Sequence, residues 1–184
     1  MSLASPEAAL VVPVPEVEPL VGGFRARHDP SAASGVPAHI TINYPFHPRF
    51  RRPEEAHRSL TDLFSRWSPF EYSLAEIRTF PGVLYLAPHP EQPFLDLIAT
   101  VAAAFPDSPP YGGQFEVAVP HLTVAQPADP TTLGSIRAEL ESVAESRLPL
   151  ACFAARILLI DNEKGSWTTH AVYPLKGPSE TSTP

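Results

Sequence analysis

The chain has 184 residues, enough for one good-sized hydrophobic core or two small lobes sharing an interface, but not for two large independent domains. Its formal net charge of -7 argues against a protein that grips long duplex DNA, because such binding needs several Lys or Arg on one face. Proline occurs 24 times, far above ordinary usage, and predicts many stiff loops. A small or short substrate therefore fits the composition better than a duplex.

The only cysteine, Cys152, excludes an internal disulfide framework and most thiolate metal sites, and its apolar neighbours predict a buried core residue. Residues 1–21 contain no Lys or Arg, and Pro13 and Pro15 interrupt their apolar stretch, so they do not resemble a signal peptide. No window approaches the roughly 18 apolar residues of a membrane span. We expect a soluble, cytoplasmic monomer that binds no membrane.

The first half of the sequence predicts alternating strands and helices. Apolar periodicity predicts a strand over 9–14, a helix within 16–28, a loop over 29–35 and an alternating strand over 38–44. A second helix is expected to begin near Pro53, which suits a first helical turn. Strands over 70–79 and 83–87 are expected around the turn residues Pro81 and Gly82.

The second half repeats this order. A helix is predicted across Phe94 to Phe105, a strand over 117–126, and another helix across Leu133 to Val143. Segments 151–160 and 167–175 are expected to close the chain as a hairpin around 162–165. The recurrence of helix, strand, helix and strand indicates an internal duplication.

The duplication predicts an α+β fold with two antiparallel-rich sheets that flank a central cleft and carry their helices on the outside. We expect one domain over 1–176 with two pseudo-symmetric lobes. Residues 177–184 are small and polar and are expected to form a disordered tail. The cleft between the lobes is the default place for a site.

One tetrapeptide pattern occurs at the equivalent strand of both halves, as His39-Ile40-Thr41-Ile42 and His121-Leu122-Thr123-Val124. Side chains alternate along a strand, so each histidine faces the same side as the threonine two residues on, and the apolar residues face the core. Two such matches among the seven histidines would arise by chance in roughly one sequence in 400.

Two imidazoles and two hydroxyls suit displacement at a phosphodiester. One imidazole can take a proton from the attacking oxygen and the other can give one to the leaving oxygen, each role typically contributing about 10²- to 10⁴-fold at neutral pH. The hydroxyls of Thr41 and Thr123 can hold the non-bridging phosphate oxygens. This scheme needs no metal or other cofactor, and two histidines without a third ligand nearby do not make a zinc site.

The duplicated motif in this α/β order resembles the 2H phosphoesterase superfamily, which includes the 2'-5' RNA ligase and cyclic nucleotide phosphodiesterase families. The resemblance spans residues 8–175. It implies catalysis without metal on 2',3'-cyclic or 2'-5' phosphodiester ends of a nucleotide or RNA. It also implies that His39 and His121 are acid and base and that Thr41 and Thr123 are phosphate ligands.

One position departs from the family pattern. In the RNA-ligase-like members the second motif commonly continues to an arginine five positions after the histidine, where this chain has Gln126. The departure argues against strong RNA-end binding and ligation and favours hydrolysis or an unknown substrate. Gln126 is nonetheless an expected substrate contact.

Aromatic residues near the motifs could stack on a base. The expected substrate contacts are Tyr44, Phe46 and Tyr85, and Phe80 and Trp167 are further candidates. Six arginines could form a basic rim: Arg25, Arg27, Arg49, Arg51, Arg52 and Arg78. Each of these residues also has a simpler interpretation, as a core aromatic or a solvated surface charge.

Two other hypotheses remain open. The chain could be a non-catalytic module that kept the cleft and binds a nucleotide or phosphorylated metabolite, or it could have a purely structural or interaction role. Each histidine taken alone could be a structural residue bonded to a neighbouring carbonyl; the equivalent placement of both favours the active site.

Overall fold

A computed structural model describes residues 6–47, 53–114 and 117–177. Its strands form two four-stranded sheets in which every pairing is antiparallel. Sheet A has the order β2-β1-β7-β8, with β1 at Ala8–Pro13, β2 at His39–Asn43, β7 at Arg156–Asp161 and β8 at Thr168–Pro174. Sheet B has the order β5-β4-β3-β6, with β3 at Phe70–Phe80, β4 at Val83–His89, β5 at Leu122–Ala125 and β6 at Leu150–Ala154. The expected α+β fold with two antiparallel sheets is confirmed.

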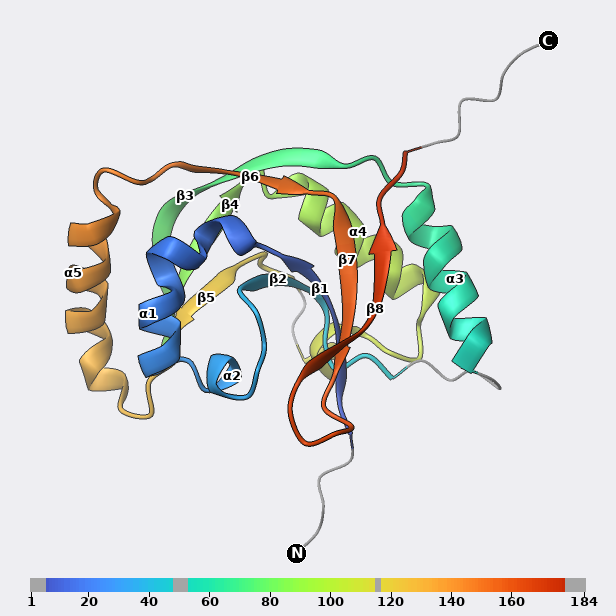
Figure 1. Cartoon of the computed structure of the whole chain (residues 1–184), viewed down its shortest axis with the longest axis horizontal. Helices are drawn as coiled ribbons and strands as arrows, with labels where there is room; N and C mark the ends of the chain where they lie inside the picture. The colour runs from blue at the N-terminus through green and yellow to red at the C-terminus, as the bar shows by residue number, and fades with distance from the viewer. Residues whose placement is uncertain (1–5, 48–52, 115–116, 178–184) are drawn as a thin grey trace, which may run out of the picture.

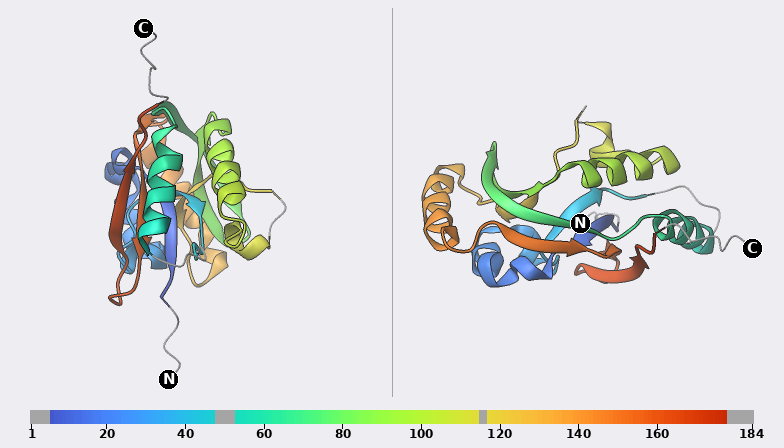
Figure 2. Two further views of the ribbon diagram at one scale, coloured as in Figure 1. Left: turned by 90° about the vertical axis from the view of Figure 1, so that its right-hand side faces the viewer. Right: turned by 90° about the horizontal axis from the view of Figure 1, so that it is seen from above.

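Five helices surround the sheets (Figure 1). They are α1 (Glu18–His28), α2 (Pro30–Ala33), α3 (Pro53–Ser65), α4 (Gln92–Ala104) and α5 (Leu133–Ala144), with short 3-10 turns η1 (Pro15–Val17), η2 (Pro110–Gly113) and η3 (Pro130–Thr132). In both views of Figure 2, α1 and α4 lie on opposite sides of the strands. Helix α1 packs near β5 of sheet B and α4 packs near β2 of sheet A, so each helix contacts a strand from the other half of the sequence.

Strand β1 is buried on both faces, and its alternating side chains join two separate clusters. Leu10 and Val12 belong to the main core, which runs through both sheets. Ala9 and Val11 face the other way and pack with a smaller cluster that also contains Val36, Leu158 and Ile160. The smaller cluster lies under the cleft described below, because Ala9, Val36 and Ile160 also line it.

The predicted strand over 151–160 is wrong, because this stretch is two strands in different sheets. Strand β6 pairs with β3 in sheet B, and the chain then crosses at Ala155 to form β7 next to β1 in sheet A. No glycine or proline marks the crossing, and both strands are apolar, so periodicity cannot detect it. The expected closing hairpin is present as β7 and β8.

Two further boundaries differ from the prediction. The expected loop over 29–35 contains a single helical turn, α2, for which the Asp29 side chain accepts the backbone N–H of Ser31. The strand predicted over 117–126 begins only at Leu122, two residues after Pro120, which has no N–H to give to a sheet. Cys152 is buried, as expected. Of the expected tail, all but Gly177 lies outside the described residues.

Candidate active site

The two His-x-Thr strands are edge strands of different sheets, and β2 and β5 contact each other where the lobes meet. The burial of both strands alternates: Ile40, Leu122 and their apolar neighbours are buried, while both histidines and both threonines are half-buried. A cavity of about 360 Å³ opens on this side. Its lining includes His39, Thr41, Tyr44, His121, Thr123 and Gln126. The structure therefore gathers both motifs around one hollow.

Both histidines are held by the same local hydrogen bond. The Nδ1 atom of His39 lies 2.8 Å from the carbonyl oxygen of Pro37, and that of His121 lies 2.7 Å from the carbonyl oxygen of Val119. A carbonyl oxygen can only accept, so Nδ1 must carry the proton in each ring. In the neutral imidazoles the lone pair is then on Nε2. This pattern gives two rings with the same tautomer, each able to accept a proton at Nε2.

The site favours neutral imidazoles at rest. Burial lowers the pKa of His39 to about 4; the hydrogen bond to Pro37 opposes this change, and the positive charge of Arg25 adds to it. Burial also lowers the pKa of His121, against the opposing effect of its bond to Val119. Near pH 7 both rings are therefore bases, and one of them has to gain a proton before it can act as an acid.

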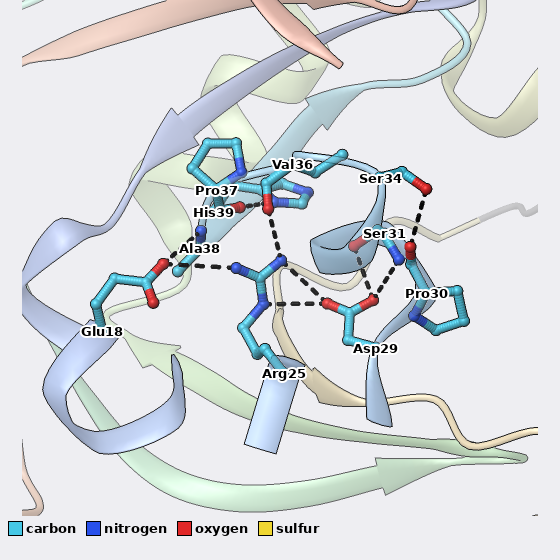
Figure 3. A network of polar contacts seen from close by, with 10 residues as sticks. All are labelled: Glu18, Arg25, Asp29, Pro30, Ser31, Ser34, Val36, Pro37, Ala38 and His39. Carbon is cyan, nitrogen blue, oxygen red and sulfur yellow. Dashed lines mark hydrogen bonds and ion pairs between the residues drawn. The ribbon is translucent and has the colours of Figure 1, made fainter. Parts of the chain in front are cut away.

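A buried polar network holds the segment just before His39 (Figure 3). Arg25 is 3% exposed, and its Nε donates to Asp29 Oδ2 at 3.0 Å while Nη2 donates to the Val36 carbonyl at 3.1 Å. Its Nη1 lies 3.6 Å from Glu18 Oε1, which also accepts the backbone N–H of Ala38 at 3.0 Å. Helix α1 thus fixes the backbone that leads into the first motif.

Asp29 connects this network to the cleft. Its Oδ1 accepts both the backbone N–H and the hydroxyl of Ser31, at 2.9 Å and 2.7 Å. Asp29 and Ser31 both line the cavity, although Asp29 is only 4% exposed. An aspartate followed by proline is a helix start signal that the sequence offers at Asp29 and Pro30. The wider network has no such local signal.

His121 is supported differently, by aromatic rings. Its imidazole packs edge-on against two rings, with centroid distances of 5.1 Å to Phe80 and 5.6 Å to Tyr85. Phe80 and Tyr85 stack on each other at 4.3 Å. Tyr85 is 4% exposed and does not line the cavity, and its ring packs against His121. We therefore do not keep Tyr85 among the substrate contacts.

Of the other expected substrate contacts, some line the cavity and one lies in the core. Tyr44 and Gln126 line the cavity, and so does Trp167. Phe46 does not: it is 3% exposed and packs edge-on against Phe105 at 5.3 Å. A ring buried in the core cannot stack on a base, so Phe46 also leaves the set of candidates.

The residue five positions after each histidine ties its strand to the opposite half. The carbonyl of Tyr44 accepts the backbone N–H of Tyr111, which follows α4. The backbone N–H of Gln126 donates to the carbonyl of His28 at the end of α1. The Tyr44 bond uses its carbonyl and the Gln126 bond uses its N–H, and each joins a motif strand to a segment from the other half of the sequence.

Tyr111 is a cleft residue that the sequence did not single out. It lines the cavity, and its backbone has φ +52°, a left-handed conformation that is uncommon for a residue with a side chain. Burial raises the pKa of Tyr111, and its hydroxyl interacts with the side chain of Thr41. The strained backbone therefore places a phenol beside one of the expected phosphate ligands.

Tyr111→Phe is expected to lower kcat/KM for a phosphodiester about 2- to 10-fold, because Thr41 loses a hydroxyl partner worth about 0.5–1.5 kcal/mol. The ring stays, so the thermal unfolding midpoint should change little. Steady-state kinetics of both proteins measures the effect. Unchanged kinetics would show that the phenol only fills space.

The expected basic rim does not reach the cleft through the arginines that the structure describes. Arg25 is committed to its buried network, Arg27 pairs with Glu139 at 3.0 Å, and Arg78 pairs with Glu76 and Glu91. Arg49, Arg51 and Arg52 lie outside the described residues. Among the described cavity residues there is no Lys or Arg, and the charged ones are Glu7 and Asp29.

Neither a metal cluster nor a membrane span occurs in the described part of the chain. No three or more His, Cys, Asp and Glu side chains within it are arranged to hold a metal ion. No helix within it has both the length and the apolar character needed to cross a membrane.

The fold and the site define a duplicated two-histidine protein with one central cleft. The family model of the 2'-5' RNA ligase superfamily matches residues 13–166, which is most of the chain. The chain belongs to this superfamily, and the predicted family resemblance is confirmed.

Relatives and solved structures agree with this assignment. A Bacillus cereus (strain G9842) protein named "Putative phosphoesterase" is 27% identical over 175 residues, covering 90% of this chain and 94% of the relative. The structure of a Thermus thermophilus protein, TT0787, is 18% identical with a TM-score of 0.62, covering 93% of this chain and 98% of that one. Escherichia coli LigT in complex with 3'-AMP is 14% identical with a TM-score of 0.58, covering 93% and 99%. At these identities the two structures establish the fold alone.

Proposed function

We propose that this protein is a phosphoesterase that hydrolyses 2',3'-cyclic or 2'-5' phosphodiester bonds of a nucleotide or RNA end by two-histidine acid and base catalysis. The observation that carries the proposal is the matched pair of histidines. Each has Nδ1 tied to the carbonyl two residues earlier, and both face one cavity with a threonine two residues on. The Nδ1 bonds make Nε2 the basic nitrogen of both neutral rings.

The reaction proceeds by in-line displacement. One neutral imidazole removes a proton from water, and the water oxygen forms a bond to phosphorus. The bond from phosphorus to the leaving ribose oxygen breaks, and the other histidine, as imidazolium, gives its Nε2 proton to that oxygen. The hydroxyls of Thr41 and Thr123 donate to the non-bridging oxygens and hold the phosphate between the rings. A monoester results, and the two imidazoles have exchanged protonation states.

The known ligands of LigT support a nucleotide substrate. Its solved structures hold 3'-AMP in one case and NADP⁺ in another. The latter structure is 16% identical to this chain with a TM-score of 0.59. Both ligands are ribonucleotides that carry phosphate groups. Nucleoside 2',3'-cyclic phosphates are therefore the first substrates to test.

The pH dependence tests the proposal. The active form needs one protonated and one neutral imidazole, and burial lowers both pKa values below the ordinary 6.5. As pH falls from 8 toward 6, kcat/KM should rise because more enzyme carries the single proton. Below about pH 4 it should fall, because the second ring, with the pKa of His39 about 4, becomes protonated as well. A bell centred below pH 6.5 is expected.

The measurement is kcat/KM for 2',3'-cyclic nucleotides and for cyclic-phosphate oligonucleotides across roughly pH 3–9 in the presence of chelator. Activity that keeps rising above about pH 7 would contradict neutral resting histidines. Binding of these ligands without turnover at any pH would instead favour a non-catalytic binding module.

A further inference from the structure

Two carboxylates line the cleft beside the expected phosphate site. Glu7 and Asp29 are the cleft's charged residues among those described, and Asp29 is neutralised by Arg25. Glu7 has no ion pair with any described Lys or Arg. A phosphodiester anion and an uncompensated carboxylate in one cavity repel each other. The carboxylate is therefore a cost to an ordinary anionic substrate, unless the substrate brings a positive charge.

Two aromatic rings adjoin this carboxylate. The Tyr44 hydroxyl donates to Glu7 Oε2 at 2.9 Å, and burial together with Glu7 raises the pKa of Tyr44, so the phenol stays a proton donor. The ring centroids of Tyr44 and Trp167 lie 6.3 Å apart, and the angle between the two ring planes is 56°. Both are half-buried on the small apolar cluster around Ala9 and Ile160, and all of these residues line the cavity.

The three residues lie directly next to the ends of β1, β2 and β8, and backbone hydrogen bonds hold them there. The Glu7 backbone N–H donates to Asn162 Oδ1 at 2.7 Å. The Trp167 backbone N–H donates to the carbonyl of Ser34 at 2.9 Å. Gly35 permits this close approach: its φ is +98°, and a Cβ there would lie 2.9 Å from the Trp167 carbonyl oxygen. This side of the cleft is built before a ligand arrives, which reduces the ordering cost of binding.

We propose that Glu7, Tyr44 and Trp167 form a subsite for an alkylammonium group on one arm of the phosphodiester substrate. Two tilted aromatic rings and a carboxylate bonded to the Tyr44 hydroxyl, all lining one cavity, supply cation–π attraction and charge compensation for an ammonium ion. The inference rests on the proposed function, since it places the phosphate between His39 and His121 and the cationic arm against Glu7. A phosphodiester that carries one alkylammonium group has no net charge and is then preferred over a diester of the same shape without that group.

The ring geometry favours a cation over a nucleobase. A base held between two rings needs them parallel, with room for a third ring in the gap, whereas Tyr44 and Trp167 lie close together at an open angle. A rounded ammonium group can contact both tilted faces at once. A base could still stack on one face, so the experiment includes that case as a distinct outcome.

Two ligands of the same shape separate charge from size: p-nitrophenyl phosphorylcholine and p-nitrophenyl 3,3-dimethylbutyl phosphate, in which carbon replaces the quaternary nitrogen. Calorimetric titration at low salt is expected to give the cationic ligand a Kd about tenfold lower. Glu7→Gln keeps an acceptor for the Tyr44 hydroxyl but removes the charge. It should reduce the ratio of the two Kd values to about threefold or less. Trp167→Leu should reduce it as well.

The matched control is Glu163→Gln, which removes a carboxylate from the exposed turn between β7 and β8 and should leave the ratio unchanged. Equal Kd values for the two ligands in the unmodified protein, or a preference that survives Glu7→Gln, would overturn the subsite. A preference for guanosine 2',3'-cyclic phosphate that disappears in Glu7→Gln would assign the carboxylate to a base edge and would also overturn it.

Turnover of the same compounds judges the proposed function separately. Suppose that cyclic nucleotides and both nitrophenyl diesters are hydrolysed and that the two nitrophenyl diesters bind with equal Kd. The phosphoesterase proposal then stands and the ammonium subsite fails. If none is hydrolysed while the Kd ratio behaves as expected, the subsite stands as a binding site and the hydrolytic proposal fails.

Discussion

Replacing either His39 or His121 by Asn is expected to lower kcat/KM for a 2',3'-cyclic nucleotide by about 10²- to 10⁴-fold. Asn is the informative choice, because its side-chain amide can occupy the place of Nδ1 and keep donating to the Pro37 or Val119 carbonyl. The change then removes Nε2 and its proton chemistry without releasing the local hydrogen bond. Steady-state kinetics at the pH optimum gives the result.

The double variant sharpens the test. Because base and acid act as a unit, His39→Asn combined with His121→Asn should cost little more than the worse single change. His89→Asn is the control, since His89 is exposed at the end of β4 and does not line the cleft. Full activity in either single variant, with the control also active, would contradict two-histidine catalysis.

The sequence correctly predicted that the two motifs lie near each other, because the pattern that identifies each motif is only four residues long. A four-residue pattern fixes which side chains share a strand face, and the duplication indicates that the two strands occupy equivalent places. The structure adds that β2 and β5 are edge strands of different sheets, which lets them meet across the interface. The aromatic candidates divided for a non-local reason. Phe46 is turned into the core by its packing on Phe105, and Tyr85 is covered by His121.

The supporting residues could not be predicted because each depends on distant parts of the chain. Tyr111 combines a left-handed backbone with a bond from its N–H to the carbonyl of Tyr44, which is 67 residues earlier in the chain. From the sequence alone, Arg25 is predicted to be a surface charge on a helix. Its burial follows only when the segment 36–39 passes over α1, and that segment is placed by the sheet.

Arg25→Met is the second change with a large expected effect, here on stability. Arg25 and Asp29 are 3% and 4% exposed, and removing the guanidinium leaves the Asp29 carboxylate buried without its cation. Breaking one side of a buried pair costs about 3–5 kcal/mol of unfolding free energy. Urea unfolding should show this loss as a lower midpoint with a similar slope.

Arg25→Met with Asp29→Asn separates the unpaired charge from the lost packing. Asn can still accept from Ser31 and start α2, but it carries no charge, so the double variant should be more stable than Arg25→Met alone by about 1–2 kcal/mol. Arg27→Met is the control from the same helix. Its pair with Glu139 is half exposed on both sides, so its loss should cost less than about 1 kcal/mol.

The same variants report whether the network positions His39. Arg25→Met releases the Val36 carbonyl and loosens the backbone that leads into β2, so kcat should fall under conditions where the protein is still folded. Arg25→Lys should not restore kcat, because an ammonium cannot reach Asp29, Val36 and Glu18 together as the planar fork does. Normal kcat in folded Arg25→Met, or full rescue by Lys, would reduce the network to a stability element. A loss of kcat in folded Arg25→Met, absent in Arg27→Met, would support Arg25 as the residue through which α1 orients the first His-x-Thr motif.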